Sequence, residues 1–220
     1  MKYFYIYIFL LICFIFIMAY YNSNKNIFYE GFTQANFILL GDSILNKNTY
    51  VDDGKSVFEL LQEKTSDKTE CFTTDNAFIS DVYSQISQIS ESDNTANSVI
   101  FLSVGSTDIL NQSDENNGQI DLNTIFTTYT KLVQTIQSTF PNPKLVLFDI
   151  FYPNNSKYEQ YYGTVQQWNN LLYNYVLKNN LNLFKLSSVL TSSQDITDIS
   201  DDIQLTETGR QQLVNAMLQY

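Results

Sequence analysis

The sequence predicts an α/β fold, a three-layer sandwich with a central, mostly parallel, five-stranded sheet. Three observations predict it. Short apolar runs alternate about five times with segments of helical periodicity. Two of these runs, Ser98–Val104 and Lys144–Phe151, are almost continuously apolar, which is typical of strands buried on both faces. No internal repeat interrupts the alternation. We therefore expect one domain with helices on both faces of the sheet.

The first half of this domain is predicted to contain two strands and two helices. In order, they are a buried strand, a helix, a weaker strand and a second helix, at Phe37–Leu40, Ser56–Glu63, Thr69–Phe72 and Ile79–Ile89. In the second helix, Val82, Ile86 and Ile89 are spaced so that they lie on one side. Each helix therefore has an apolar face to pack on the sheet.

The second half is predicted to alternate in the same way. Its elements are the strand Ser98–Val104, a helix that begins at Asp121, the strand Lys144–Phe151, a helix at Tyr158–Leu177, a strand at Leu181–Leu186 and a final helix. Pro141 ends the helix that begins at Asp121, because proline cannot continue it. Thr206 is the expected N-cap of the final helix.

An apolar segment precedes the domain. The run from Tyr3 to Tyr21 contains no charged residue, and as a helix it nearly spans a hydrocarbon core of about 30 Å. A cleaved signal peptide and a buried core helix are the alternatives. Signal peptides usually have a shorter apolar part and end in a small-x-small site, which the stretch Met18–Tyr21 lacks. We expect a transmembrane anchor at 1–21, a tether at 22–35 and the α/β domain at 36–220.

The orientation of this anchor follows from few charges. Lys2 lies on one side of it and Lys25 on the other, so the positive-inside rule favours a cytoplasmic N-terminus only weakly. The sequons Asn111-Gln112-Ser113 and Asn154-Asn155-Ser156 are compatible with that orientation. We expect a single-pass membrane protein whose soluble domain lies on the non-cytoplasmic side.

Charge and composition exclude several classes of function. The net charge is −11 and the chain has a single arginine, so it lacks the basic surface that nucleic-acid binding or docking on anionic lipid needs. The chain has no histidine, and its cysteines are Cys13, inside the apolar segment, and Cys71. We therefore expect no disulfide within the domain, no metal site built from cysteine and histidine, and no cofactor.

Three polar stretches follow the predicted strands or precede the last helix. They are Gly41-Asp42-Ser43, Val104-Gly105-Ser106-Thr107-Asp108 and Asp201-Asp202-Ile203-Gln204-Leu205-Thr206. Taken singly, each is explained by a strand-to-helix turn or a helix cap. In an open parallel sheet, however, ligands bind beyond the carboxyl ends of the strands, which is where these stretches are expected to meet.

Together, and in this order, the three stretches resemble the signature blocks of the SGNH or GDSL hydrolase family. The resemblance covers the predicted domain and implies a flavodoxin-like sheet and a serine esterase or lipase activity. It implies that Ser43 is the nucleophile. A glycine of a second block and the asparagine of a G-x-N-D block then supply oxyanion-hole donors, and a terminal D-x-x-H block supplies the base and its orienting aspartate.

The sequence departs from this pattern at three positions. Gly105 and Asp108 match the G-x-N-D block, but Thr107 stands at the asparagine. The second block corresponds to Asp75–Asp81, where Ser80 or Asp81 replaces the glycine. In the terminal block Asp201 matches, but Gln204 stands at the histidine. Only the serine among the four signature residues is retained, with Gly41 and Asp42 beside it.

These departures bear on the chemistry. A serine hydroxyl is a weak nucleophile until a base takes its proton, and a glutamine amide cannot accept a proton near neutral pH. Loss of a triad base costs roughly 10⁴ to 10⁶ in turnover, and loss of one oxyanion donor about 10² to 10³. Lys47 lies four residues after Ser43, whereas a serine–lysine pair is spaced by three. A desolvated Asp201 or Asp202 is the best substitute base.

Three functions remain open at this point. The first is a membrane-anchored, esterase-like protein with impaired or lost hydrolysis that binds an acyl or acetylated-carbohydrate ligand. The second is a slow but genuine ester hydrolase that uses Ser43 and a carboxylate base. The third is a structural membrane protein whose domain makes only protein contacts. The 16 tyrosines and 16 phenylalanines are compatible with sugar binding, but such residues more often form core.

Overall fold

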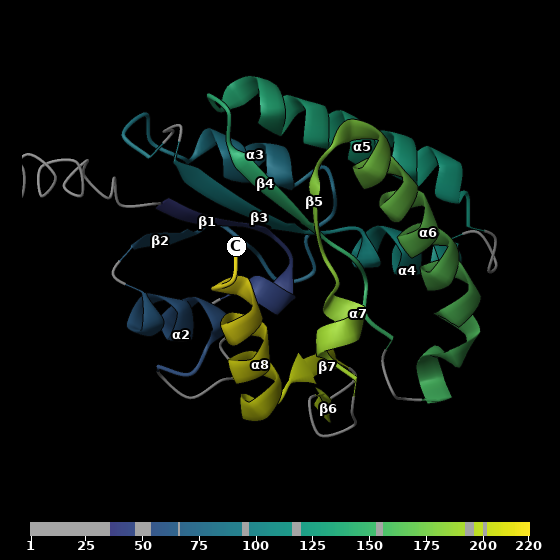
Figure 1. Cartoon of the computed structure of the whole chain (residues 1–220). Coiled ribbons are helices and arrows are strands. Elements are labelled where there is room, and N and C mark those ends of the chain that lie inside the picture. Colours follow the sequence, from purple (N-terminus) through teal and green to yellow (C-terminus); the bar gives the residue numbers. More distant parts are fainter. Residues whose placement is uncertain are drawn as a thin grey trace, which may run out of the picture. The chain divides into compact units, whose positions relative to one another are not determined.

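A parallel sheet of five strands lies at the centre of the structure, a computed structural model (Figure 1). The strands are β1 (Asn36–Gly41), β2 (Lys68–Cys71), β3 (Ser98–Ser103), β4 (Lys144–Phe148) and β5 (Asn182–Phe184). Their order across the sheet is β2-β1-β3-β4-β5, and every neighbouring pair is parallel. The predicted five-stranded sheet is therefore confirmed.

The structure describes residues 36–46, 54–65, 67–93, 97–115, 120–152, 156–191, 196–199 and 202–220. The predicted anchor at 1–21 and the tether at 22–35 lie outside these ranges. Within them, no helix combines the length and the apolar character that a membrane crossing requires.

Helices cover both faces of the sheet, as Figure 1 shows. One face packs against α3 (Val82–Ser87), α5 (Leu122–Thr139) and α6 (Tyr162–Asn179). The opposite face packs against α2 (Val57–Lys64), the short α7 (Leu186–Val189) and α8 (Glu207–Met217). The predicted three-layer arrangement is confirmed.

The two apolar cores explain why the strands read as continuous apolar runs. Side chains alternate between the faces of a strand. In β1, Ile38 and Leu40 belong to the core under α3 and α5, whereas Phe37 and Leu39 belong to the core under α2 and α8. Because both faces are covered, neither set of alternate positions is polar.

Several predicted boundaries were wrong. The strand predicted at Lys144–Phe151 ends at Phe148, and the strand predicted at Leu181–Leu186 ends at Phe184. Both end where Asp149 accepts hydrogen bonds from the backbone N–H and the hydroxyl of Ser187, which lies in the first turn of α7. Both strands thus end at hydrogen bonds between segments that are distant in the sequence. The hydrophobic periodicity of the sequence does not reveal such bonds.

Five short elements were not predicted as such: η1 (Ser43–Leu45), η2 (Ser156–Tyr161), α7 and the antiparallel pair of β6 (Ile196–Ile199) and β7 (Asp202–Leu205). One longer helix, α4 (Ser106–Glu115), was not predicted either. The helix predicted at Ile79–Ile89 is confined to Val82–Ser87. The helix predicted at Tyr158–Leu177 is η2 followed by α6. Short elements lack enough turns to show a clear period.

Candidate functional site

The carboxyl ends of β1 and β3 meet at Gly41. In the sheet register, Gly41 lies opposite Ser103. Gly41 has a φ of +116°, and a Cβ atom on it would lie 1.7 Å from the Ser103 carbonyl oxygen. Only glycine allows this close approach. It places the next two residues, Asp42 and Ser43, directly beyond the sheet.

The backbone of Gly41 is held by a buried glutamine of α3. Gln85 is 1% exposed. Its Oε1 accepts a hydrogen bond from the Gly41 N–H at 2.8 Å, and its Nε2 donates to the Gly41 carbonyl at 3.0 Å. A side-chain amide thus replaces a neighbouring strand at the end of β1 and fixes the start of the turn.

Asp42 is a buried carboxylate at the edge of the sheet, 5% exposed. Its Oδ1 accepts hydrogen bonds from the Ser103 hydroxyl at 3.0 Å and from the Ile44 N–H at 3.4 Å. Its Oδ2 accepts one from the Ser106 hydroxyl at 3.1 Å. Burial raises the pKa of Asp42 to about 6, although these hydrogen bonds lower it.

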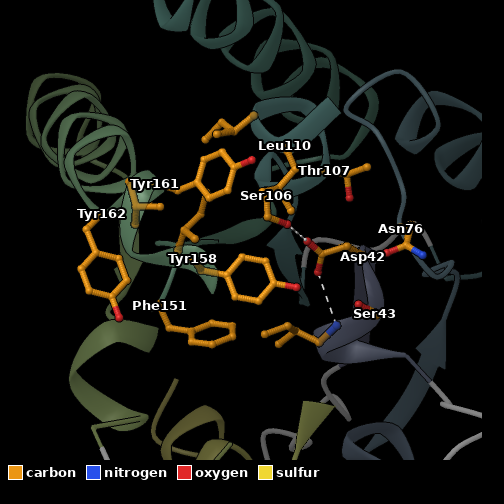
Figure 2. A pocket seen from close by; sticks show the side chains of 14 residues that line it. Asp42, Ser43, Asn76, Ser106, Thr107, Leu110, Phe151, Tyr158, Tyr161 and Tyr162 are labelled. Atoms are coloured by element: carbon orange, nitrogen blue, oxygen red, sulfur yellow. Dashed lines mark hydrogen bonds between the residues drawn. The ribbon is translucent and has the colours of Figure 1, made fainter. Parts of the chain in front are cut away.

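Ser43 opens η1 and lines a cavity of about 130 Å³ (Figure 2). The polar part of its wall contains Asp42, Ser106, Thr107 and Asn76. The rest of the wall is apolar and aromatic: Ile44, Ile109, Leu110, Ile150, Phe151, Tyr158, Tyr161, Tyr162 and Val165. No lysine or arginine is among the described residues that line the cavity. The cavity therefore suits an uncharged group with one polar end.

The aromatic part of the wall comes from the segment after β4. Phe151 follows the strand, and Tyr158, Tyr161 and Tyr162 lie in η2 and at the start of α6. Figure 2 shows the Tyr158 hydroxyl pointing toward Asp42 and Ser43. Sequence reasoning predicted a helix at Tyr158–Leu177 but did not predict this wall. The position of the segment beyond a central strand was the one signal that pointed to it.

Of the predicted oxyanion residues, the structure brings Thr107 to the cavity and gives Gly105 a packing role. Thr107 lies in the first turn of α4 and lines the cavity beside Ser43. Gly105 has a φ of +121°, and a Cβ on it would lie 2.7 Å from the Trp168 ring. Gly105 therefore lets the start of α4 approach α6 closely.

The second block reaches the cavity through a different residue from the one predicted. Ser80 is exposed and is not among the residues that line the cavity. Asn76, in the same loop, has a φ of +53° and does line it. Asp108 accepts a hydrogen bond from the Ile79 N–H at 3.0 Å, so it connects this loop to α4. Burial raises the pKa of Asp108 above its ordinary value, although the Ile79 bond lowers it.

The terminal block is described only in part. Asp201 lies outside the described residues, as does the side chain of Gln204. The backbone of Gln204 lies in β7, paired with Thr197 of β6. Thr206 caps α8 as predicted, because its hydroxyl accepts a hydrogen bond from the Gly209 N–H at 3.1 Å. The assignment of Asp201 and Gln204 to the site stays a prediction.

Comparison with known proteins connects this fold to one group of enzymes. No protein-family model matches the chain, and no curated protein does. Solved structures do match. A lipolytic protein of the G-D-S-L family from Veillonella parvula has a TM-score of 0.65 at 16% identity, covering 84% of this chain and 97% of the other.

Two further structures carry named activities. An acetyl xylan esterase has a TM-score of 0.62 at 18% identity, covering 84% of this chain and 98% of that one. Phospholipase A1 from Streptomyces albidoflavus has a TM-score of 0.62 at 14% identity, covering 85% and 99%. The chain therefore has the SGNH (GDSL) hydrolase fold, as the G-D-S block and its companions indicated.

Proposed function

We propose that this chain is a membrane-anchored, SGNH esterase-like protein that binds the acyl group of an ester at Ser43, with impaired or lost hydrolysis at that serine. One observation carries the proposal: Ser43 lies at the polar end of a cavity of about 130 Å³ with apolar walls. For scale, an apolar cavity of about 150 Å³ accepts benzene. The cavity therefore suits a short acyl chain or the acetyl group of a sugar.

The impairment follows from what surrounds Ser43. Within the described residues, no side chain forms a hydrogen bond with the Ser43 hydroxyl. The chain contains no histidine to act as a base, and Gln204 stands where the family has one. Ester turnover through Ser43 is therefore expected to be about 10⁴ or more below that of an intact triad.

Binding is tested by titrating the full-length chain with ethyl butyrate and with an acetylated methyl xyloside, followed by NMR. We expect saturable binding of at least one ligand. Leu110→Trp, which fills the cavity, should weaken binding at least about tenfold. Leu177→Trp is the matched control, because Leu177 is 62% exposed on α6 and lies outside the cavity wall. Absence of binding to the unaltered chain contradicts the proposal.

The impairment is tested by restoring the family residues. Gln204→His together with Thr107→Asn should raise hydrolysis of p-nitrophenyl butyrate by about 10² or more. Robust turnover by the unaltered chain that Ser43→Ala abolishes would instead favour the genuine hydrolase with a carboxylate base. If the cavity binds neither ligand, a role in protein contacts alone becomes the better account.

The membrane part of the proposal rests on the uncharged run Tyr3–Tyr21. The full-length chain should stay with the membrane fraction after an alkaline carbonate wash and keep its N-terminus in intact-mass analysis. A variant that lacks 1–35 should be released. Loss of the N-terminal segment from the mature protein favours a cleaved signal peptide.

A further inference from the structure

A second serine, Ser106, lines the cavity that contains Ser43. β3 ends at Ser103, and Ser106 opens α4 three residues later, directly after Gly105 with its φ of +121°. A sharp turn between a strand and a helix is a position from which a serine hydroxyl faces the carboxyl edge of a sheet. Ser106 is therefore placed as a nucleophile is placed in many sheet enzymes, independently of Ser43.

Ser106 has a carboxylate in direct contact with its hydroxyl. The Ser106 Oγ donates a hydrogen bond to Asp42 Oδ2 at 3.1 Å, which Figure 2 marks with a dashed line. The other oxygen of Asp42 is occupied by Ser103 and Ile44. Ser103 and Ile44 thus hold the Oδ1 of Asp42 in place, and its Oδ2 faces the Ser106 hydroxyl at the cavity.

Asp42 is also suited to accept a proton. Because burial raises the pKa of Asp42 to about 6, its carboxylate is ionised at neutral pH but more basic than an exposed aspartate. A base with a pKa close to the working pH transfers protons more effectively. Asp149 is a useful contrast: it also bonds a serine, Ser187, but neither residue lines the cavity that contains Ser43.

We propose that Ser106 and Asp42 form a nucleophile–base pair that transfers the acyl group of an ester bound in the cavity. The Ser106 Oγ attacks the carbonyl carbon while its proton passes to Asp42 Oδ2. The bond from that carbon to the alcohol oxygen breaks, and the alcohol leaves with the proton. Water then attacks the acyl–Ser106 ester and gives a proton to Asp42. Asp42 passes this proton to the Ser106 Oγ as the carboxylic acid leaves. The inference rests on the proposed function for its ligand but not on Ser43.

The test uses a short-chain fluorophosphonate on the full-length chain, with the adduct located by peptide mass spectrometry. In this reaction the Oγ–phosphorus bond forms and the phosphorus–fluorine bond breaks, releasing fluoride and the serine proton. We expect the adduct on Ser106, with labelling lost in Ser106→Ala and reduced at least about tenfold in Asp42→Asn. Ser187→Ala is the matched control, because it removes a serine hydroxyl that donates to another aspartate, Asp149, and neither residue lines the cavity.

Two outcomes would overturn the inference. An adduct found on Ser43 alone assigns the chemistry to the family serine. A folded chain that binds ethyl butyrate but gives no adduct on Ser106 rejects the pair and leaves the proposed ligand-binding function standing. If ethyl butyrate does not bind but Ser106 is still labelled, the proposed cavity ligand is wrong and the reactive pair survives. Circular dichroism of each variant separates loss of reactivity from loss of fold, and the adduct site in the unaltered chain decides the question even if Asp42→Asn does not fold.

Discussion

At the scale of single residues, Gly41 and Asp42 do more to define this site than Ser43 does. Gly41 allows β1 to approach Ser103, and the turn it begins buries Asp42 beneath the cavity. The carboxylate of Asp42 in turn accepts hydrogen bonds from the hydroxyls of both Ser103 and Ser106. The two residues before Ser43 thus hold the site together whether or not Ser43 reacts.

Gly41→Ala should abolish stable folding. The new Cβ would lie 1.7 Å from a backbone oxygen that cannot move alone, and φ is +116°. We expect a loss of about 4 kcal/mol or more in the free energy of unfolding. Gly163→Ala is the control, because a Cβ at this position in α6 meets nothing within 4 Å and should stabilise the helix by up to about 1 kcal/mol. Urea unfolding measures both, and equal stabilities would refute the close approach.

Asp42→Asn should change the pH dependence of stability. The pKa of Asp42 is about 6 in the folded chain, above its ordinary value of 3.8, so the folded state favours the protonated carboxyl. The contribution of Asp42 to stability is therefore present below about pH 4 and is lost as the pH rises through about 6. Relative to the unaltered chain, the variant should gain about 2 kcal/mol between pH 4 and pH 7.

Urea unfolding of both chains at several pH values checks this prediction. Every other titratable group is present in both chains, so the difference between their stabilities reports Asp42 to a first approximation. A difference that does not vary with pH would show that Asp42 does not carry the raised pKa. The same ionised carboxylate that destabilises the fold is the one that the proposed pair uses.

At the scale of elements, two side-chain amides hold the segments that carry the cavity. Gln85 of α3 binds both backbone groups of Gly41. Asn169 of α6 does the same for Ile150, accepting from its N–H at 2.9 Å and donating to its carbonyl at 2.7 Å. Helices on one face of the sheet thus fix the chain where it leaves β1 and β4. These contacts couple helix packing to the shape of the cavity.

Asn169→Leu should loosen the segment after β4. It leaves the N–H and carbonyl of Ile150 without this partner, which costs about 2 to 3 kcal/mol of stability. Because Ile150 and Phe151 line the cavity, ester binding should weaken as well. Asn170→Leu, on the exposed neighbouring position, should change stability by less than about 0.5 kcal/mol. If denaturant unfolding shows equal losses of stability for the two substitutions, the hydrogen bonds between Asn169 and Ile150 do not hold this segment.

At the scale of the whole molecule, the chain carries a net charge of −11. The cavity wall adds no lysine or arginine among its described residues, so neither the surface nor the site favours anionic partners. Repulsion between the excess negative charges opposes the compact, folded state, and salt screens this repulsion. The charge therefore bears on stability and on the choice of ligand, but not on the fold.

Stability at pH 7 should rise with ionic strength. Raising sodium chloride from about 10 mM to about 200 mM shortens the Debye length from about 30 Å to less than 10 Å, which screens the repulsion between carboxylates. We expect the melting temperature to rise by a few degrees. Potassium chloride serves as a control for ion-specific effects. A fall in the melting temperature would show that attractive ion pairs such as Lys68–Asp93 dominate.

Local pattern determined the broad architecture of this protein. Continuous apolar runs such as Ser98–Val104 predicted a sheet covered on both faces, and the G-D-S block marked the end of the first strand as the place of the site. Periodicity and turn residues are properties of neighbours in sequence, so they carry this information without the fold. The absence of any histidine from the chain was equally visible from the sequence.

Only the tertiary structure decided which side chains meet. The hydrogen bonds from Ser106 to Asp42, from Gln85 to Gly41 and from Asn169 to Ile150 join residues 64, 44 and 19 positions apart. The aromatic residues Phe151, Tyr158, Tyr161 and Tyr162 line the same cavity as Ser43, which is far from them in the chain. Their partners are chosen by strand order and helix packing, which no local period specifies. Burial, and with it the raised pKa of Asp42, likewise depends on what the rest of the chain places around that carboxylate.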